Sequence, residues 1–197
     1  MGIFRFGRFG GGTRRQLFRD AFGEWMEQTM ARAERRVVVE RYVRPPGALP
    51  EVAFLAACTR CSECITACPP RALVKVPASG GLAAGTPHIR AARQACTVCQ
   101  DMPCAAVCPT EALTIPERGW EGYRIGVLEF MPEHCITYRG MSCTVCTGAC
   151  PQGDSALALD AEGHPVLRIE GCVGCGICFN VCVSTPKSFR LTPLGDE

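Results

Sequence analysis

The stretch from residue 58 to residue 69 reads CTRCSECITACP and places four cysteines within about eleven residues. Three further groups of four follow it, so every one of the 16 cysteines in the 197-residue chain belongs to such a group. The groups are Cys58, Cys61, Cys64 and Cys68; Cys96, Cys99, Cys104 and Cys108; Cys135, Cys143, Cys146 and Cys150; and Cys172, Cys175, Cys178 and Cys182. Proline follows the fourth cysteine in groups one to three, and valine follows it in group four. This internal repeat predicts a fold built from similar units.

The cysteine spacing predicts metal–sulfur sites rather than disulfide bonds. Groups one and four have the spacing C-x2-C-x2-C-x3-C of bacterial ferredoxins, which bind [4Fe–4S] clusters. Iron in such a cluster needs a soft thiolate ligand, so cysteine is the required residue type. Structural zinc is the main alternative, but zinc ribbons use two cysteines per arm, and here three or four are packed together. We therefore predict four [4Fe–4S] clusters, with all 16 cysteines as ligands.

Groups two and three depart from the regular spacing. Four residues separate Cys99 from Cys104, and seven separate Cys135 from Cys143. Each insertion predicts a loop beside a cluster. Such a loop would form a docking surface, shield the cluster or have no special role, and the sequence leaves these alternatives open.

A short tail repeats after the cysteine groups. It reads PRAL at residues 70–73, TEAL at 110–113 and DSAL at 154–157, with a weaker echo, KSFRL, at 187–191. In bacterial ferredoxins this tail leads from a short helix into a strand, and residues 73–76 and 113–115 have strand character. We expect an α+β fold of two bacterial-ferredoxin-like dicluster units, with short helices and small antiparallel sheets around the clusters.

The N-terminal region differs from the rest in charge. Residues 1–44 carry a net charge of +5 and the remainder −3, which gives the total of +2. Apolar residues recur at helical spacing over residues 13–36 and predict an amphipathic helix. This helix would dock on a partner or a membrane surface, or pack on the protein itself. The proline-rich segment 44–50 predicts a linker, so we expect a basic arm at 1–50 and a four-cluster domain at 51–197.

Residues 13–19, TRRQLFR, resemble a twin-arginine export signal. An export signal requires an apolar segment next, whereas charged residues follow here. No apolar run reaches the length of a membrane span. We therefore expect a cytoplasmic protein, with export to the periplasm by the twin-arginine route as the alternative.

The sequence offers no set of residues for catalysis. It lacks a dinucleotide or phosphate-binding glycine motif, and its three histidines form no nucleophilic or acid–base set. His134 adjoins Cys135, but we interpret it as a surface histidine. The glycines at 171, 174 and 176 are expected to let the backbone approach a cluster. These features predict an electron carrier without a small-molecule substrate or nucleic-acid partner. The alternative is an assembly or maturation partner of a reductase that acts through residues 1–44.

The irregular groups also resemble a known family. Residues 85–87 (GTP) with 96–109 (CTVCQDMPCAAVCP), and residues 126–128 (GVL) with 134–146 (HCITYRGMSCTVC), look like NapG/MauM-type ferredoxins. Residues 44–46 (RPP), 54–55 (FL) and 58–61 (CTRC) resemble the related NapF-type proteins. The resemblance implies an electron-transfer protein of a respiratory system, with a reductase, a dehydrogenase or a membrane quinol oxidase subunit as its partner.

Similarity with four-cluster electron-transfer subunits implies a nested pairing of the groups. Groups one and four would form one unit and groups two and three the other, with the fourth cysteine of each group ligating the cluster of its partner group. In that arrangement Cys182 completes cluster one and Cys150 completes cluster two. The alternative is sequential pairing of groups one with two and three with four, which the chain lengths between groups allow.

Overall fold

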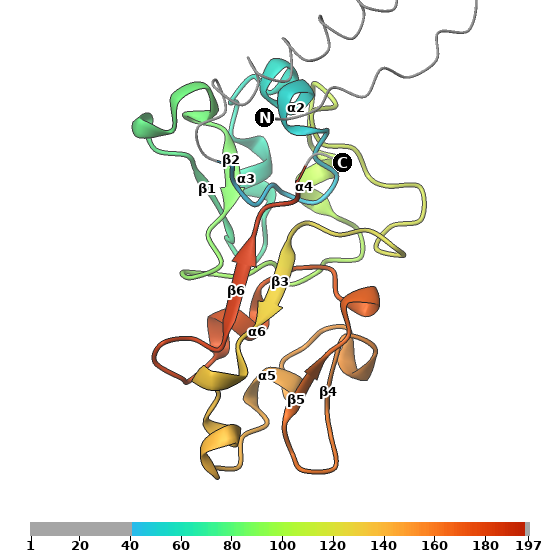
Figure 1. Cartoon of the computed structure of the whole chain (residues 1–197). Coiled ribbons are helices and arrows are strands. Elements are labelled where there is room, and N and C mark those ends of the chain that lie inside the picture. The colour runs from blue at the N-terminus through green and yellow to red at the C-terminus, as the bar shows by residue number, and fades with distance from the viewer. Residues whose placement is uncertain (1–40, 196–197) are drawn as a thin grey trace, which may run out of the picture. The chain divides into compact units, whose positions relative to one another are not determined.

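The computed structural model describes residues 41–195 (Figure 1). The chain divides into two units with the boundary between Val39 and Glu40, and all described residues lie in the second unit. The helix expected at 13–36, the twin-arginine-like stretch and most of the basic arm therefore lie outside the described residues.

The described chain consists of two halves with the same order of pairing elements, half one (residues 41–124) and half two (residues 125–195). Half one contains helices α2 (Glu51–Ala57), α3 (Glu63–Ala67) and α4 (Pro103–Ala106), strands β1 (Leu73–Lys75) and β2 (Pro87–Ile89), and the 3-10 segment η1 (Ala78–Ala83). Half two contains helices α5 (Val145–Gly148) and α6 (Ile177–Val181), strands β3 (Val127–Phe130), β4 (Leu157–Leu159), β5 (Pro165–Leu167) and β6 (Phe189–Thr192), and 3-10 segments Pro132–His134, Ile136–Arg139, Gly153–Ser155 and Ile169–Gly171.

Antiparallel pairing joins neighbouring cysteine groups in each half. β1 pairs with β2 and β4 with β5, so the tail of one group pairs with the segment that precedes the next group. The outer segments pair as well, through β3 with β6 in half two and a single bridge from Ala48 to Leu113 in half one. The predicted strand at 73–76 is confirmed, whereas 113–115 contributes only that bridge. The mixture of short helices and small antiparallel sheets confirms the α+β prediction.

The proline-rich segment 44–50 is part of the folded unit, and the expected linker is wrong. Pro45 is fully buried, and the Leu49 amide donates to the Ala112 carbonyl oxygen at 3.1 Å. The Arg44 guanidinium is buried and forms an ion pair with Glu51, in which Nε and the carboxylate oxygen are 2.8 Å apart. Prolines cannot continue a helix, but an extended segment with fixed φ can pack against a core. The unit boundary therefore lies at residues 39–40 rather than at residue 50.

The two halves are in direct contact within this unit. The Cys96 amide donates to the Cys175 carbonyl oxygen at 3.3 Å, and Asn180 Nδ2 donates to the Ala91 carbonyl oxygen at 2.9 Å. Leu191 packs against the buried cores of both halves. The junction thus places group two beside group four.

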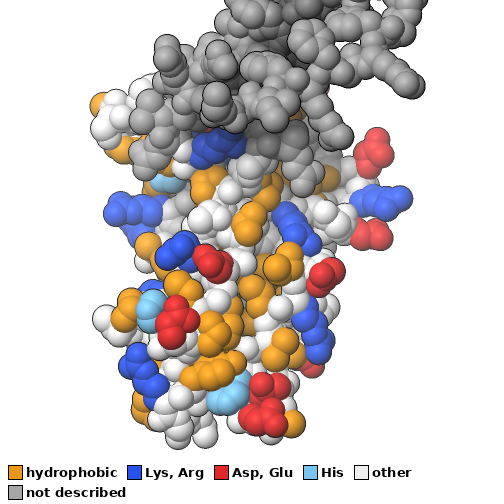
Figure 2. All heavy atoms as spheres, in the orientation of Figure 1, with side chains coloured by type: hydrophobic (Ala, Val, Ile, Leu, Met, Phe, Trp, Pro, Cys, Tyr) orange, Lys and Arg blue, Asp and Glu red, His pale blue; other side chains and the backbone are white. Residues whose placement is uncertain are grey.

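Basic, acidic and apolar side chains alternate on the face in Figure 2, without one large patch of a single charge sign. Among residues 41–195, no helix is long and apolar enough to cross a membrane.

Candidate metal centres

The sixteen cysteines converge in four sets of four. In each set, three cysteines come from one group and the fourth comes from the neighbouring group of the same half. We number the sites by the group that gives three cysteines: site 1 has Cys58, Cys61, Cys64 and Cys108; site 2 has Cys96, Cys99, Cys104 and Cys68; site 3 has Cys135, Cys143, Cys146 and Cys182; site 4 has Cys172, Cys175, Cys178 and Cys150.

This convergence overturns the nested pairing expected by similarity. Cys182 lies with group three rather than with group one, and Cys150 lies with group four rather than with group two. The reason is the strand pairing: β1–β2 and β4–β5 close short loops between consecutive groups, which costs less chain entropy than closing a long loop. The exchange of fourth cysteines is the one seen in two-cluster ferredoxins.

The same backbone turn presents the sulfurs in groups one, two and four. The residue before the second cysteine has positive φ in each: Arg60 at 61°, Val98 at 57° and Gly174 at 70°. The residue two before the third cysteine has positive φ too, at Ser62, Met102 and Gly176. Such values are uncommon for non-glycine residues and cost energy, so the glycines of group four adopt them with less strain. Group three, with its seven-residue insertion, has neither turn.

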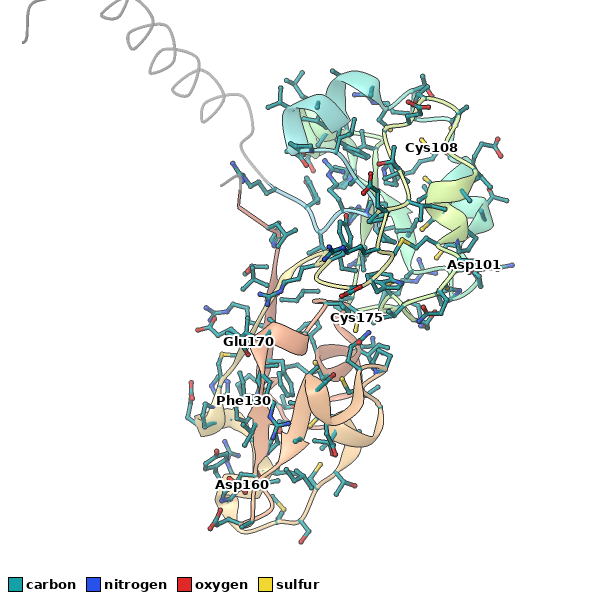
Figure 3. The ribbon with its side chains drawn as sticks, turned by 90° about the vertical axis from the view of Figure 1, so that its right-hand side faces the viewer. Asp101, Cys108, Phe130, Asp160, Glu170 and Cys175 are labelled. Carbon is teal, nitrogen blue, oxygen red and sulfur yellow. The ribbon has the colours of Figure 1, made fainter. Side chains whose placement is uncertain are left out.

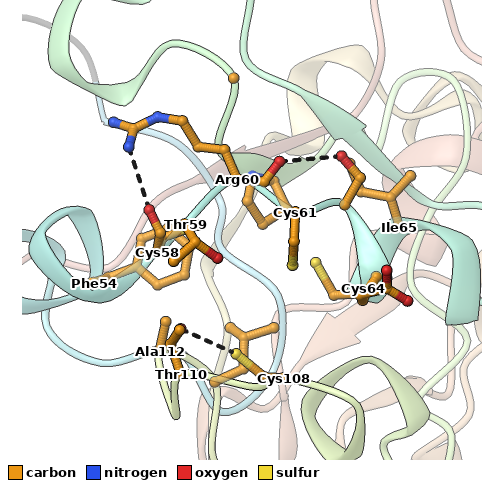
Figure 4. Close-up of a pocket in the computed structure, with 15 residues that line it drawn as sticks. Phe54, Cys58, Thr59, Arg60, Cys61, Cys64, Ile65, Cys108, Thr110 and Ala112 are labelled. Carbon is orange, nitrogen blue, oxygen red and sulfur yellow. Dashed lines mark hydrogen bonds between the residues drawn. The ribbon is translucent and has the colours of Figure 1, made fainter.

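Site 1 contains Cys61, which is the one exposed cysteine among the sixteen. Figure 4 shows Cys61, Cys64 and Cys108 pointing toward a common space. Cys61 is exposed, and the exposed side chain of Arg60 donates to the Ala84 and Leu82 carbonyl oxygens at 2.9 Å each. Burial raises the pKa of Cys64 to about 11, with the charges of Cys58, Cys61 and Cys108 as further causes. The four thiols of site 1 are therefore close enough to repel one another when ionised.

Site 2 has three buried cysteines and none that is exposed. Burial raises the pKa of Cys104 to about 12, and the charges of Cys96 and Cys68 add to this effect. Trp120 lines the site and its Nε1 donates to the Cys99 carbonyl oxygen at 2.8 Å. The indole therefore fixes the segment that holds the second cysteine of the group.

Site 4 lies at the junction of the halves. Burial raises the pKa of Cys175 to about 12, and Cys96 of site 2 contributes to that shift together with Cys172 and Cys150. Burial also raises the pKa of Cys178 strongly. Sites 2 and 4 are thus electrostatic neighbours across the junction.

Site 3 resembles site 1 in that, despite burial, hydrogen bonds lower the pKa of its exchanged cysteine, Cys182 at site 3 and Cys108 at site 1. Burial raises the pKa of Cys146 to about 11. At Cys182 burial also acts to raise the pKa, but the backbone N–H groups and the hydroxyls of Ser188 and Ser184 outweigh it and the net shift is downward. Thr137 Oγ1 lies 3.2 Å from Cys135 Sγ. The sulfurs of site 3 therefore have polar neighbours that lie inside the protein.

The donor sets fit a group of several metal ions better than a single ion. Within residues 41–195, no three or more histidine, cysteine or acidic side chains are close enough together to hold one metal ion. The four sulfurs of each site instead surround a small cavity. Because several thiolates repel one another in a buried space, the ionised form of each site would be stabilised by the positive charge of bound metal. Four soft thiolates around a cavity match an iron–sulfur cluster.

Two details of the sequence interpretation change in the structure. His134 is half-buried rather than a surface residue, with Nδ1 3.2 Å from the Lys187 carbonyl oxygen, so it joins the start of group three to the segment before β6. Gly174 serves the packing within half two as well as the turn, because a Cβ there would overlap the Gly126 carbonyl. Sequence reasoning missed the hydroxyls of Thr137, Ser184 and Ser188 at site 3, although Ser188 stands where the tail repeat has alanine.

Comparison with known proteins shows which family the chain belongs to. No family model matches it. The ferredoxin-type protein NapG of Escherichia coli is 37% identical over 163 residues, which cover 77% of this chain and 71% of that protein. The methylamine utilization ferredoxin-type protein MauM of Methylophilus methylotrophus is 33% identical over 195 residues, covering 91% and 86%.

The ferredoxin-type protein NapF of Escherichia coli is also similar, at 31% identity over 145 residues, covering 71% of this chain and 79% of that protein. The cysteine sets described above and these similarities lead to one conclusion. The chain belongs to the NapG/MauM family of ferredoxin-type proteins, and it is an iron–sulfur electron carrier rather than an enzyme.

Proposed function

We propose that this chain binds four [4Fe–4S] clusters, one at each site, and passes single electrons between two redox proteins. The observation that carries the proposal is the convergence of all sixteen cysteines in four complete sets. When bound, each cluster supplies one-electron redox chemistry, and the protein supplies the thiolates, the burial and the hydrogen bonds that set its potential.

The order of electron transfer follows from the contacts between sites. Sites 1 and 2 exchange Cys108 and Cys68, and sites 3 and 4 exchange Cys182 and Cys150. The hydrogen bond from Cys96 to Cys175 joins sites 2 and 4. Figure 3 labels Cys108 within half one and Cys175 where the halves meet. We therefore propose the path 1–2–4–3, in which sites 1 and 3 are the two ends.

The residues around the ends are suited to the exchange of electrons with other proteins. Cys61 at site 1 is exposed, and Val183 at site 3 lines the site while 58% of its surface remains exposed. A partner that contacts either end would come close to bound metal without a change in the fold. The interior sites would serve only to connect the ends.

The partner class follows from the relatives. One group of relatives is named for methylamine utilization. We propose a respiratory oxidoreductase as the partner, either a reductase, a dehydrogenase or a membrane quinol oxidase subunit. Docking through residues 1–44, membrane-surface contact and a cytoplasmic location remain predictions. The mature N-terminus, read by mass spectrometry of protein from separated cell fractions, tests the location.

The proposed function is tested by anaerobic purification with iron, sulfide and protein analysis. We expect four irons and four sulfides for each of the four sites, as in other cubane clusters. Reduction with dithionite should give S = 1/2 EPR signals that interact magnetically and disappear on reoxidation. Zinc in place of iron, or iron that cannot be reduced reversibly, would contradict the proposal.

A further inference from the structure

The buried polar side chains of residues 41–195 fall into two groups. Arg44, Glu51 and Thr86 form one hydrogen-bonded network, in which Arg44 donates to both partners. The other three all line site 3, and they are Thr137, Ser184 and Ser188. Buried polar groups require hydrogen-bond partners. Three buried hydroxyls around one site therefore need hydrogen-bond acceptors, which the apolar packing of half two does not supply.

The hydroxyls face the sulfur ligands of site 3. Thr137 Oγ1 is 3.2 Å from Cys135 Sγ, and the Ser188 amide donates to Cys182 Sγ at 3.5 Å. Ser188 is completely buried, and its hydroxyl helps to lower the pKa of Cys182, although its Oγ forms no hydrogen bond of good geometry with any described residue. A sulfur atom of a group bound at site 3 would supply a better-placed acceptor.

The internal repeat provides a comparison within the same molecule. Ser188 occupies the position of the tail repeat that holds Ala72, Ala112 and Ala156 after the other three groups. Ala112 lines site 1 and Ala156 lines site 4, and both are buried. The lining of site 4 contains no serine or threonine. A hydroxyl at this position is therefore specific to site 3 and is not required by the fold.

We infer that the hydroxyls of Thr137 and Ser188 donate to sulfur at site 3 and hold the potential of this site above that of site 4. The inference rests on the proposed function, because it takes a [4Fe–4S] cluster as the bound group. Reduction adds one electron and no proton, so negative charge on the sulfurs increases. Hydrogen bonds from donors to sulfur then become stronger, which favours the reduced form.

This difference gives the path a direction within half two. With clusters bound, an electron that reached site 4 from site 2 would pass to site 3. This step would reoxidise site 4 and reduce site 3. Site 3 is thus the end at which electrons accumulate before they leave to an acceptor protein. Thr137 and Ser188 act through the cluster potential and are positioning residues.

The test is an anaerobic redox titration followed by EPR on the full-length protein and its variants. The site 3 signal is identified by its loss in Cys146→Ala, and the site 4 signal by its loss in Cys178→Ala. In the native protein, site 3 should be reduced before site 4. In Thr137→Val or Ser188→Ala, the reduced-to-oxidised ratio of site 3 at fixed potential should fall about tenfold, which is 59 mV for one electron.

Matched variants separate this effect from a general loss of structure. Thr137→Ser retains the hydroxyl and should keep the native potential. Thr97→Val removes an exposed hydroxyl that lies 3.6 Å from Cys99 Sγ at site 2, and should leave site 3 unchanged. Ser188→Ala introduces the alanine that the tail repeat has after the other three groups, so this variant should fold.

Site 3 reduced after site 4 in the native protein, or no shift in either hydroxyl variant at full iron content, would overturn the inference. An iron content below that of four clusters in the native protein would instead contradict the proposed function.

Discussion

Half one and half two share one topology, but the residues around site 1 in half one differ from those around site 3 in half two. Site 1 is lined by exposed polar and charged residues, among them Arg60 and Glu63, and its Cys61 is open to solvent. Site 3 is lined by buried hydroxyls and by the exposed apolar side chains of Val145 and Val183. The comparison teaches that the strand pairing brings the cysteines together, while the residues between them decide what each site does. Two dissimilar ends also suit two different partner proteins.

The largest effect is expected from removal of a fourth cysteine. Cys182→Ala should lose site 3 and keep site 1, whereas Cys108→Ala should lose site 1 and keep site 3. Each variant should lose about a quarter of its iron, because each removes a ligand of a single cluster. Iron analysis and EPR measure both outcomes. Loss of site 1 in Cys182→Ala would restore the nested pairing and break the comparison of the two halves.

Each half also has an arginine–glutamate pair, and the two pairs differ in burial. Arg44 and Glu51 are buried in half one, whereas the side chains of Arg190 and Glu129 in half two are 61% and 59% exposed. Arg44→Met leaves a buried carboxylate unpaired and should lower the free energy of unfolding by about 3–5 kcal/mol. Arg190→Met should lower it by less than about 1 kcal/mol. Anaerobic denaturant titration compares them, and equal losses would be evidence against the buried network.

Close packing within half two is tested at Gly174. Alanine there would have a positive φ and a Cβ that overlaps Gly126, so we expect a loss of about 2–4 kcal/mol in the free energy of unfolding. Gly163 has a similar φ of 84° and open space around it, and Gly163→Ala should cost only about 1 kcal/mol. Denaturation of both variants measures the difference. A Gly174→Ala protein as stable as Gly163→Ala would show that the close contact between Gly174 and Gly126 is dispensable.

The smallest effect concerns the dependence of iron binding on pH at the interior sites. Burial raises the thiol pKa from the ordinary 9.0 to about 12 at Cys104 and Cys175. Such thiols stay protonated in the metal-free protein below pH 9 and must release their protons to bind iron. Apparent iron affinity should therefore increase with pH between about 6 and 9. Reconstitution at a series of pH values, read by absorbance, checks this. Loading that does not depend on pH would contradict it.

The raised thiol pKa values also predict how the stability of the metal-free protein changes with pH. A thiol with a raised pKa favours the folded state below pH 9.0, and this contribution is lost as pH rises toward 11–12. Circular dichroism of metal-free protein should therefore show loss of structure above pH 9. The iron-loaded protein, whose thiolates are paired with metal, should be unaffected over the same range.

The sequence by itself determined the four groups of cysteines, the α+β class, the strand at residues 73–75 and the family. These features depend on local spacing, which is written directly in the order of residues. Only the tertiary structure decided the pairing of groups one with two and three with four, because loop closure and strand register are properties of the folded chain. It also decided that residues 44–50 belong to the core, since burial of Pro45 and Arg44 depends on distant partners. The role of Ser188 was hidden for the same reason: a serine in a weak repeat acquires meaning only when the fold buries it beside sulfur.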